Sequence, residues 1–141
     1  MRTSARNQFR GRIASVRHGA VNADVVLDLG DGLSIFANIT NEAVDELALQ
    51  PGRDAVALIK ASFILLSPDP NIRISARNRL RGVISEIIPG AVNGEVKLSL
   101  AGGRVLTAVV TLDALKELQL VPGGECTALI KSSHVLVAVN D

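Results

Sequence analysis

The sequence predicts an all-β fold with one short helix per repeat, arranged as two tandem OB-type five-stranded β-barrels. The first observation behind this prediction is a tandem repeat: Ser4–Ser67 aligns with Ser75–Ala138 without a gap, and about 29 of roughly 64 aligned pairs are identical. The second is that three stretches of alternating polar and apolar residues open each repeat. The third is that a short helical pattern and two short apolar runs follow. This order of elements is that of an OB-type barrel, with its helix between the third and fourth strands.

Alternation predicts the first three strands. In residues 9–16, apolar and polar positions alternate around Gly11, which is typical of a half-buried strand. A second alternating stretch, residues 23–29, ends at Gly30-Asp31-Gly32, a tight hairpin signal. The third stretch covers residues 33–39, and its apolar face should meet that of the second across the hairpin.

The pattern then changes from strand to helix and back. Thr40 is a good N-cap, and apolar residues recur at helical spacing over residues 43–49 before Pro51-Gly52. The apolar runs Ala55–Lys60 and Phe63–Leu66 have the length of strands. They complete the five strands of the first barrel.

The repeat also predicts the domain organisation. The first OB domain is expected at residues 1–67 and the second at residues 73–141. Residues 68–72 form the expected linker, because the paired prolines in this region block helix and central strand alike. The second repeat has its hairpin at 101–103 and its helix from Thr111 to about Leu120.

Composition indicates a cytoplasmic protein that assembles into oligomers. A domain of this size buries only about 60% of its unfolded surface and is marginal alone. Cys126 is the only cysteine, so no intrachain disulfide can stabilise it, and its alignment with Ala55 predicts a small core residue. Oligomerisation is the expected source of further burial. No run approaches 18 apolar residues and no apolar leader begins the chain, so no membrane association is expected.

The sequence argues against catalysis. His18 aligns with Pro89 and His134 with Phe63, so neither histidine is repeated. No Cys/His cluster has metal-ligand spacing, and no P-loop or nucleophile-elbow motif occurs, so we expect no enzyme activity and no direct cation ligands. Nucleic-acid binding is also not expected. The net charge is only +1. The chain has three Phe and no Tyr or Trp, so it offers few aromatic side chains on which bases could stack.

Arginines are unevenly distributed. They crowd the beginning of each repeat, as Arg2, Arg6, Arg10 and Arg12 and as Arg73, Arg77, Arg79 and Arg81. For Arg10 and Arg12, we expect a solvated basic strand face.

A polar set recurs in both repeats and predicts an anion site. Ser4-Ala5-Arg6-Asn7 returns as Ser75-Ala76-Arg77-Asn78, and an Ala-Leu-Ile-Lys run ends at Lys60 and at Lys131. These side chains are hydrogen-bond donors and fixed positive charges, which suit an oxyanion that is already charged. Each feature alone also has a structural interpretation. The Ser and Asn side chains would form hydrogen bonds with nearby backbone where a strand begins. The lysines would only place a charge at the end of an apolar strand and so protect it from aggregation.

A third repeated segment is Gly-Ala-Val-Asn, at Gly19–Asn22 and Gly90–Asn93. Its donors also suit an anion, and a plain turn is an equal alternative.

Several motifs together resemble one family. "ISARN" followed by "L-R-G-x-I", then "GAVN-x-E-V" and "ALIKSS-x-V-L", resemble the molybdate-binding Mop domain family, the molbindins, in its two-domain (di-Mop) form. The resemblance implies OB-type barrels assembled around a three-fold axis as a homotrimer, with molybdate or tungstate as ligand and no cofactor. It implies intracellular molybdenum storage and homeostasis without catalysis. The alternative function is a molybdate-sensing module that acts with a separate DNA-binding partner.

The resemblance also assigns site residues. Interface sites would combine a Ser-Ala-Arg segment of one domain with a Lys-containing segment of another. Their residues would be Ser4, Ala5, Arg6, Lys60, Ala61, Ser62, Ser75, Ala76, Arg77, Lys131, Ser132 and Ser133. Sites on the three-fold axis would use Gly19, Ala20, Val21, Asn22, Gly90, Ala91, Val92 and Asn93. Ala61 aligns with Ser132, so a hydroxyl contact there is available only in the second repeat. One Arg and one Lys, such as Arg6 and Lys60, would neutralise the two charges of a molybdate dianion.

Overall fold

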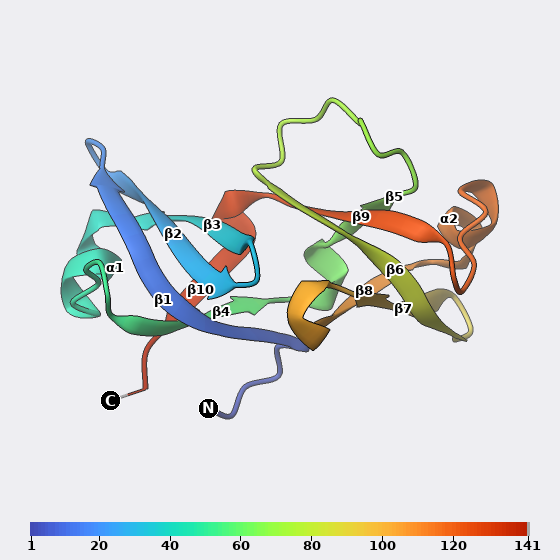
Figure 1. Ribbon diagram of the computed structural model, residues 1–141, viewed down its shortest axis with the longest axis horizontal. Helices are drawn as coiled ribbons and strands as arrows, with labels where there is room; N and C mark the ends of the chain where they lie inside the picture. The colour runs from blue at the N-terminus through green and yellow to red at the C-terminus, as the bar shows by residue number, and fades with distance from the viewer. Residues whose placement is uncertain (141) are drawn as a thin grey trace. The chain divides into compact units, whose positions relative to one another are not determined.

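The computed structural model describes residues 1–140, and these form two compact units, each built around one antiparallel sheet (Figure 1). Unit one contains residues 1–59 and the segment that begins at Lys131. Unit two contains Lys60–Ile130.

Unit one has five strands and one α-helix. Its elements are β1 (Asn7–His18), β2 (Asn22–Gly30), β3 (Leu33–Thr40), α1 (Asn41–Glu46), β4 (Asp54–Ile59), the 3-10 helix η3 (Ser132–His134) and β10 (Val135–Ala138). The strand order is β10-β4-β1-β2-β3. The edge strands β10 and β3 also contact each other, so the sheet curls on itself. This is the order expected of an OB-type barrel, and the predicted fold class is confirmed.

Unit two repeats the arrangement. Its elements are η1 (Ala61–Phe63), β5 (Leu65–Ser67), β6 (Asn78–Pro89), β7 (Asn93–Ser99), η2 (Ala101–Gly103), β8 (Val105–Thr111), α2 (Leu112–Glu117) and β9 (Glu125–Ile130). The strand order is β5-β9-β6-β7-β8, with β5 again close to β8.

Every second side chain along the strands points into the barrel and forms its apolar core. Ile13, Val25, Leu27 and Ile35 are among the fully buried side chains of unit one. They come from β1, β2 and β3, and the residues between them are exposed or half-buried. Burial of such side chains is the main favourable contribution to folding of a domain this small.

The fifth strand of each unit comes from the other repeat. In unit one, Val135 of β10 pairs with Ile59 of β4, and in unit two, Leu65 of β5 pairs with Leu129 of β9. Figure 1 shows the red β10 in the sheet of the green β4, and the green β5 in the sheet of the orange β9. The compact units therefore differ from the expected domains 1–67 and 73–141. Both fifth strands are short and rich in apolar residues, so their sequences alone do not distinguish which sheet edge each one joins.

The predicted hairpin and helix cap are confirmed in the first repeat. Gly30, Asp31 and Gly32 all have positive φ, as the tight turn requires. The backbone N–H of Ala43 donates to Thr40 Oγ1 at 3.1 Å.

Three element boundaries differ from expectation. The helices are shorter than predicted, because Ala48 (φ 50°) and Gln119 (φ 54°) turn the backbone out of the helical conformation before the Pro-Gly pairs. Residues 63–66 are not one strand, since η1 occupies 61–63 and only then does β5 begin.

Candidate functional site

Asn7 and Asn78 fix the ends of the duplicated Ser-Ala-Arg-Asn segments. The Asn7 side chain is 1% exposed, and its Nδ2 donates to the carbonyl oxygen of Ile59 at 3.2 Å. Asn78 makes the same bond to Ile130, also at 3.2 Å. The asparagines thus bond to backbone, as the structural interpretation expects, but to a strand 52 residues away along the chain rather than to the local backbone. These bonds hold the three preceding residues just beyond one end of each sheet.

The lysine segments reach the same ends of the sheets. In unit one, β4 ends at Ile59, which pairs with Asn7 on one side and with Val135 on the other. Residues 4–6 precede β1 and residues 131–133 precede β10, so both segments lie beyond this end of the sheet. Strand exchange thus brings the Ser-Ala-Arg segment of one repeat into the same unit as the lysine segment of the other repeat.

Unit two has the same arrangement with the repeats reversed. Residues 75–77 precede β6, and residues 60–62 lead through η1 into β5. Asn78 pairs with Ile130, and Leu65 pairs with the neighbouring Leu129. Each lysine lies where the chain passes from one unit into the other, directly after Ile59 or Ile130.

The expected interface donors are exposed in the single chain. Ser4, Arg6, Lys131 and Ser133 of unit one are exposed, and Ala5 and Ser132 are half-buried. In unit two, Ser75, Arg77, Lys60 and Ser62 are exposed, Ala76 is half-buried and Ala61 is buried. The donors therefore face solvent at each sheet end, and an anion held by them alone would remain hydrated.

One lysine has an aromatic neighbour. Lys60 Nζ lies 5.4 Å from the centre of the Phe63 ring, within the range of a cation–π contact. The residue aligned with Phe63 is His134, so this contact distinguishes the two lysine segments.

The Gly-Ala-Val-Asn segments are tight turns that project from both barrels. The Gly19 N–H donates to the Asn22 carbonyl at 2.7 Å, and the Gly90 N–H donates to the Asn93 carbonyl at 2.8 Å. These two N–H groups are therefore already paired within their turns. The turn valines are among the most exposed apolar residues, at 71% for Val21 and 72% for Val92.

Hydrogen bonds with side chains of β3 and α1 hold the first turn, and two of the residues that make them are replaced in the second repeat. Asn22 Nδ2 donates to Asn38 Oδ1 at 3.1 Å, and Asn38 Nδ2 donates to Asp24 Oδ1 at 2.9 Å. Because the carboxylate of Asp24 can only accept, it fixes the orientation of both amides. Asn41 Nδ2 also donates to the Gly19 carbonyl at 3.0 Å.

In the second repeat, Val109 aligns with Asn38 and Leu112 aligns with Asn41, so neither link can form. Alignment of the repeats reveals these two substitutions from sequence alone. Their effect becomes clear only from the hydrogen bonds that Asn38 and Asn41 make in the first turn.

Cys126 is a core residue, as predicted. Its side chain is 0% exposed, and burial raises the pKa of the Cys126 thiol from its ordinary value of 9.0. Such a thiol remains protonated and unreactive near neutral pH.

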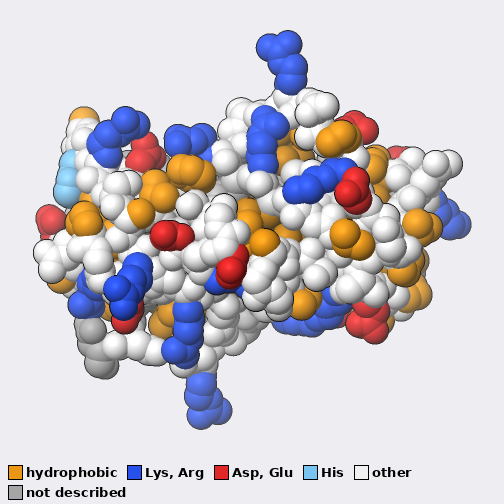
Figure 2. Space-filling view, in the orientation of Figure 1, with side chains coloured by type: hydrophobic (Ala, Val, Ile, Leu, Met, Phe, Trp, Pro, Cys, Tyr) orange, Lys and Arg blue, Asp and Glu red, His pale blue; other side chains and the backbone are white. Residues whose placement is uncertain are grey.

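Charge is dispersed on the face shown in Figure 2. Blue Lys and Arg side chains alternate there with red Asp and Glu side chains, and they form no continuous basic track among the described residues of this face. None of the described helices is long and apolar enough to cross a membrane.

The fold and the repeated donor segments define a tandem-barrel protein that presents the same donor-lined sheet end in each of its two units. The chain belongs to the TOBE domain family, which matches residues 3–66 and 74–137. The match covers both repeats, in agreement with the duplication.

Similar proteins confirm the resemblance to the Mop family. A solved structure of the cytoplasmic molybdate-binding protein ModG, with molybdate bound, is 44% identical and superposes with a TM-score of 0.95, covering 99% of this chain and 100% of that chain. The molybdenum-pterin-binding protein MopA of Rhodobacter capsulatus is 47% identical over 99% of this chain and 53% of its own length. The DNA-binding transcriptional dual regulator ModE of Escherichia coli (strain K12) is 33% identical over 98% of this chain and 52% of its own length. The chain spans about half the length of the curated relatives it matches.

Proposed function

We propose that the protein binds molybdate or tungstate without chemically changing it, and that it serves intracellular molybdenum storage and homeostasis in the cytoplasm. The observation that carries this proposal is the presence, at one end of each sheet, of a Ser-Ala-Arg segment and a Lys-x-Ser segment from different repeats. The likeness to ModG, whose structure contains molybdate, supports the choice of ligand.

The interface sites divide by unit. In unit one, Ser4, Ala5 and Arg6 would act with Lys131, Ser132 and Ser133, and in unit two, Ser75, Ala76 and Arg77 would act with Lys60, Ala61 and Ser62. Arginine supplies a planar fork and lysine a point charge, so together they balance the two charges of the dianion. The serine hydroxyls and backbone N–H groups would orient it.

A second and third copy of the chain would complete these sites. The exposed donors would leave an anion partly hydrated, and an anion binds tightly only when it is enclosed and fully hydrogen-bonded. A homotrimer with three-fold symmetry supplies that enclosure. It would also bring together three copies of each Gly-Ala-Val-Asn turn, which explains why the exposed valines Val21 and Val92 occur in both repeats.

Each ring of three turns would provide an axial site. Its residues would be Gly19–Asn22 in one ring and Gly90–Asn93 in the other. The N–H groups of Gly19 and Gly90 are paired within the turns, so the other turn N–H groups and the asparagine amides would face the anion.

Isothermal titration with molybdate, sulfate, phosphate and a single-stranded oligonucleotide tests this function. We expect strong binding of molybdate and much weaker binding of the other three. Equal binding of sulfate, or binding of the oligonucleotide in preference to molybdate, would contradict the proposal.

Light scattering with and without molybdate tests the role of assembly. Molybdate should raise the melting temperature by mass action, and the species that binds it should be an oligomer. A monomer that binds molybdate tightly would contradict the proposed enclosure.

The second candidate function is a molybdate-sensing module that acts with a separate DNA-binding partner. It is favoured by the match to half of the regulator ModE. The two functions share the anion sites and differ in partner, so capture of a DNA-binding protein that depends on molybdate would favour sensing. With molybdate as a ligand rather than a reactant, neither function requires a cofactor, an enzyme activity, a membrane or direct contact of this chain with nucleic acid.

A further inference from the structure

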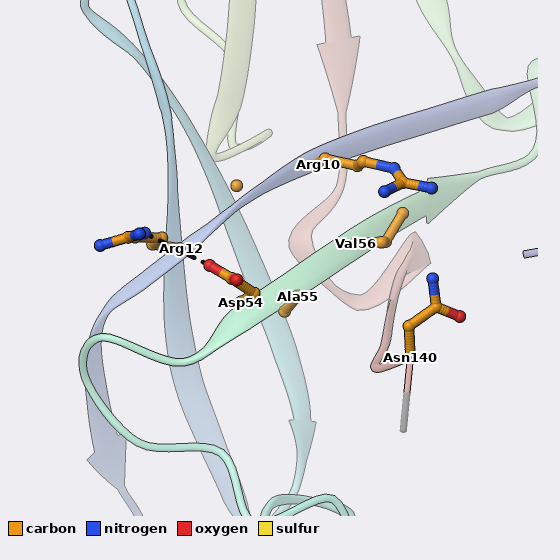
Figure 3. Close-up of a pocket in the computed structure, with 7 residues that line it drawn as sticks. Arg10, Arg12, Asp54, Ala55, Val56 and Asn140 are labelled. Carbon is orange, nitrogen blue, oxygen red and sulfur yellow. Dashed lines mark ion pairs between the residues drawn. The ribbon is translucent and has the colours of Figure 1, made fainter.

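Unit one has a cleft of about 440 Å³ on the outer side of β1 and β4, away from the sites proposed above. Arg10 and Arg12 contribute from β1, Asp54 and Val56 from β4, and Asn140 from the segment that follows β10 (Figure 3). These strands are paired so that Arg10 lies opposite Val56 and Arg12 lies opposite Asp54.

The two arginines of the cleft have different surroundings. Arg12 Nε lies 3.3 Å from Asp54 Oδ1 and forms an ion pair with it. Arg10 is exposed and has no hydrogen bond or ion pair with any of the described residues. Figure 3 shows its guanidinium directed away from the Arg12–Asp54 pair and lying near Val56, on the side where Asn140 is found. Among the described residues of the cleft, the guanidinium of Arg10 is therefore unpaired.

The second repeat shows how such an arginine is normally satisfied. Arg81, which aligns with Arg10, donates to Thr127 Oγ1 at 2.9 Å and to the Pro68 carbonyl at 3.3 Å. It also forms an ion pair with Glu125 at 3.4 Å. The second repeat thus gives its arginine three partners from its own chain.

Two substitutions account for the loss of the two side-chain partners, the hydroxyl and the carboxylate, from the first repeat. Val56 replaces Thr127, which eliminates the hydroxyl acceptor. Arg12 replaces Val83 and takes the carboxylate of Asp54, which aligns with Glu125. Both changes leave the guanidinium of Arg10 available to a ligand.

We propose that this cleft binds a small organic carboxylate. The Arg12–Asp54 pair is neutral overall, so Arg10 contributes a net single positive charge, which matches a monoanion. The planar fork of Arg10 fits a carboxylate with two parallel hydrogen bonds. Val56 lines the cleft beside Arg10 without offering a polar group, although only 5% of it is exposed, and the Asn140 amide supplies a donor and an acceptor.

The volume of the cleft bears on the kind of ligand that it can take. Its volume lies within the range of about 300–1,000 Å³ that is usual for small-molecule sites. A tetrahedral inorganic anion would leave most of it empty. The ligand therefore has an organic part that fills the cleft beyond the guanidinium of Arg10, and this binding is independent of molybdate.

The test is a titration of the intact protein with sodium benzoate, followed by the backbone amide NMR signals. Benzoate should shift the signals of Arg10, Val56 and Asn140 saturably, with a dissociation constant of about 1 mM. Molybdate and sulfate should not saturate these signals. No saturable shift with benzoate, or equal saturation by sulfate, would overturn the proposal.

Variants at the two aligned arginines provide the matched comparison. Arg10→Ala should weaken benzoate binding at least about tenfold, and Arg10→Lys should also weaken it because lysine lacks the fork. Arg81→Ala should leave binding unchanged. Unchanged binding in Arg10→Ala, or full binding in Arg10→Lys, would overturn the proposal.

A graft from the second repeat tests the same cause without removing Arg10. The double variant Arg12→Val with Val56→Thr restores to Arg10 a free carboxylate and a hydroxyl, as Arg81 has them. Benzoate binding should then be lost, although Arg10 and the fold remain. A graft that binds benzoate as the natural protein does would show that chain partners do not control the cleft.

Discussion

The Asn7 side chain bonds to the backbone of Ile59 at 3.2 Å, directly where β1 begins and β4 ends. The bond recurs between Asn78 and Ile130. In each unit it joins the last residue of the Ser-Ala-Arg-Asn segment to the residue that precedes a lysine. It is thus the fixed point from which the candidate donors extend.

Asn7→Ala should lower the free energy of unfolding by about 1–3 kcal/mol, because it leaves a buried carbonyl without its donor. Urea unfolding followed by circular dichroism measures this change. Gln8→Ala, at the exposed neighbouring position, is the control and should have little effect. Equal small effects at both positions would show that the asparagine does not anchor the segment.

Arg6→Ala and Lys131→Ala should each weaken molybdate binding about thirtyfold or more, because each removes one of the two charges that balance the dianion. In a double-mutant cycle, the proposed division predicts that Arg6 couples more strongly with Lys131, which belongs to its unit, than with Lys60, which directly follows the Ile59 that pairs with Asn7. Isothermal titration gives the coupling energies. Stronger coupling between Arg6 and Lys60 would reject the proposed division of the sites.

Arg10→Ala is the control for this cycle. It removes a charge from β1, the strand that Arg6 precedes, and should leave molybdate affinity nearly unchanged. Circular dichroism should show native folding in every variant that is compared.

Asn22→Asp should abolish one axial site and Asn93→Asp the other, because three carboxylates around one ring repel an anion. Metal analysis of saturated protein should fall from about eight anions per trimer to about seven in either variant, if six interface sites and two axial sites are filled as the symmetry implies. An unchanged count in both variants would mean that the axial sites do not bind.

The two variants should differ in stability. A new carboxylate at position 22 would face Asn38 Oδ1, whose orientation is fixed by the bond from Asn38 to Asp24. In the second repeat, Val109 takes the place of Asn38, so a carboxylate at position 93 would meet no such oxygen. Asn22→Asp should therefore lower the melting temperature more than Asn93→Asp does. Differential scanning calorimetry without ligand checks this order.

Cys126 should react slowly with a thiol reagent in the folded protein and rapidly after unfolding. Burial raises its folded pKa above 9.0, so the folded state holds the thiol proton more tightly than the unfolded state. The sign follows from this: the contribution of Cys126 to stability is fully present below pH 9.0 and is lost as the pH rises toward and through the folded pKa. Urea unfolding at rising pH should show this decrease, and Cys126→Ala should reduce it.

Much of the fold could be predicted because its signals are local. The alternation of residues 23–29 and 33–39 with the glycines between them identifies the β2–β3 hairpin, and Thr40 identifies the beginning of α1. The exchange of fifth strands could not be predicted in this way. Leu65 and Leu136 align and are identical, so the sequence of a fifth strand does not show which barrel it completes.

The candidate site could be predicted only as a set of residue types. Duplication singled out Arg6, Arg77, Lys60 and Lys131, but not which arginine shares a unit with which lysine. That pairing depends on the exchange. The two hydrogen bonds that link Asn22, Asn38 and Asp24 also depend on strand register. Val109 replaces Asn38 in the second repeat, so comparison of the two repeats does not single them out.

The borrowed strands make the two halves of the molecule mutually dependent. Each compact unit contains strands from both repeats: β10 of the second repeat lies in unit one, and β5 of the first repeat lies in unit two. A break within residues 68–72 would leave two fragments clasped together, each holding a strand of the other. Neither repeat can therefore be deleted without removing a strand from the sheet of the other repeat.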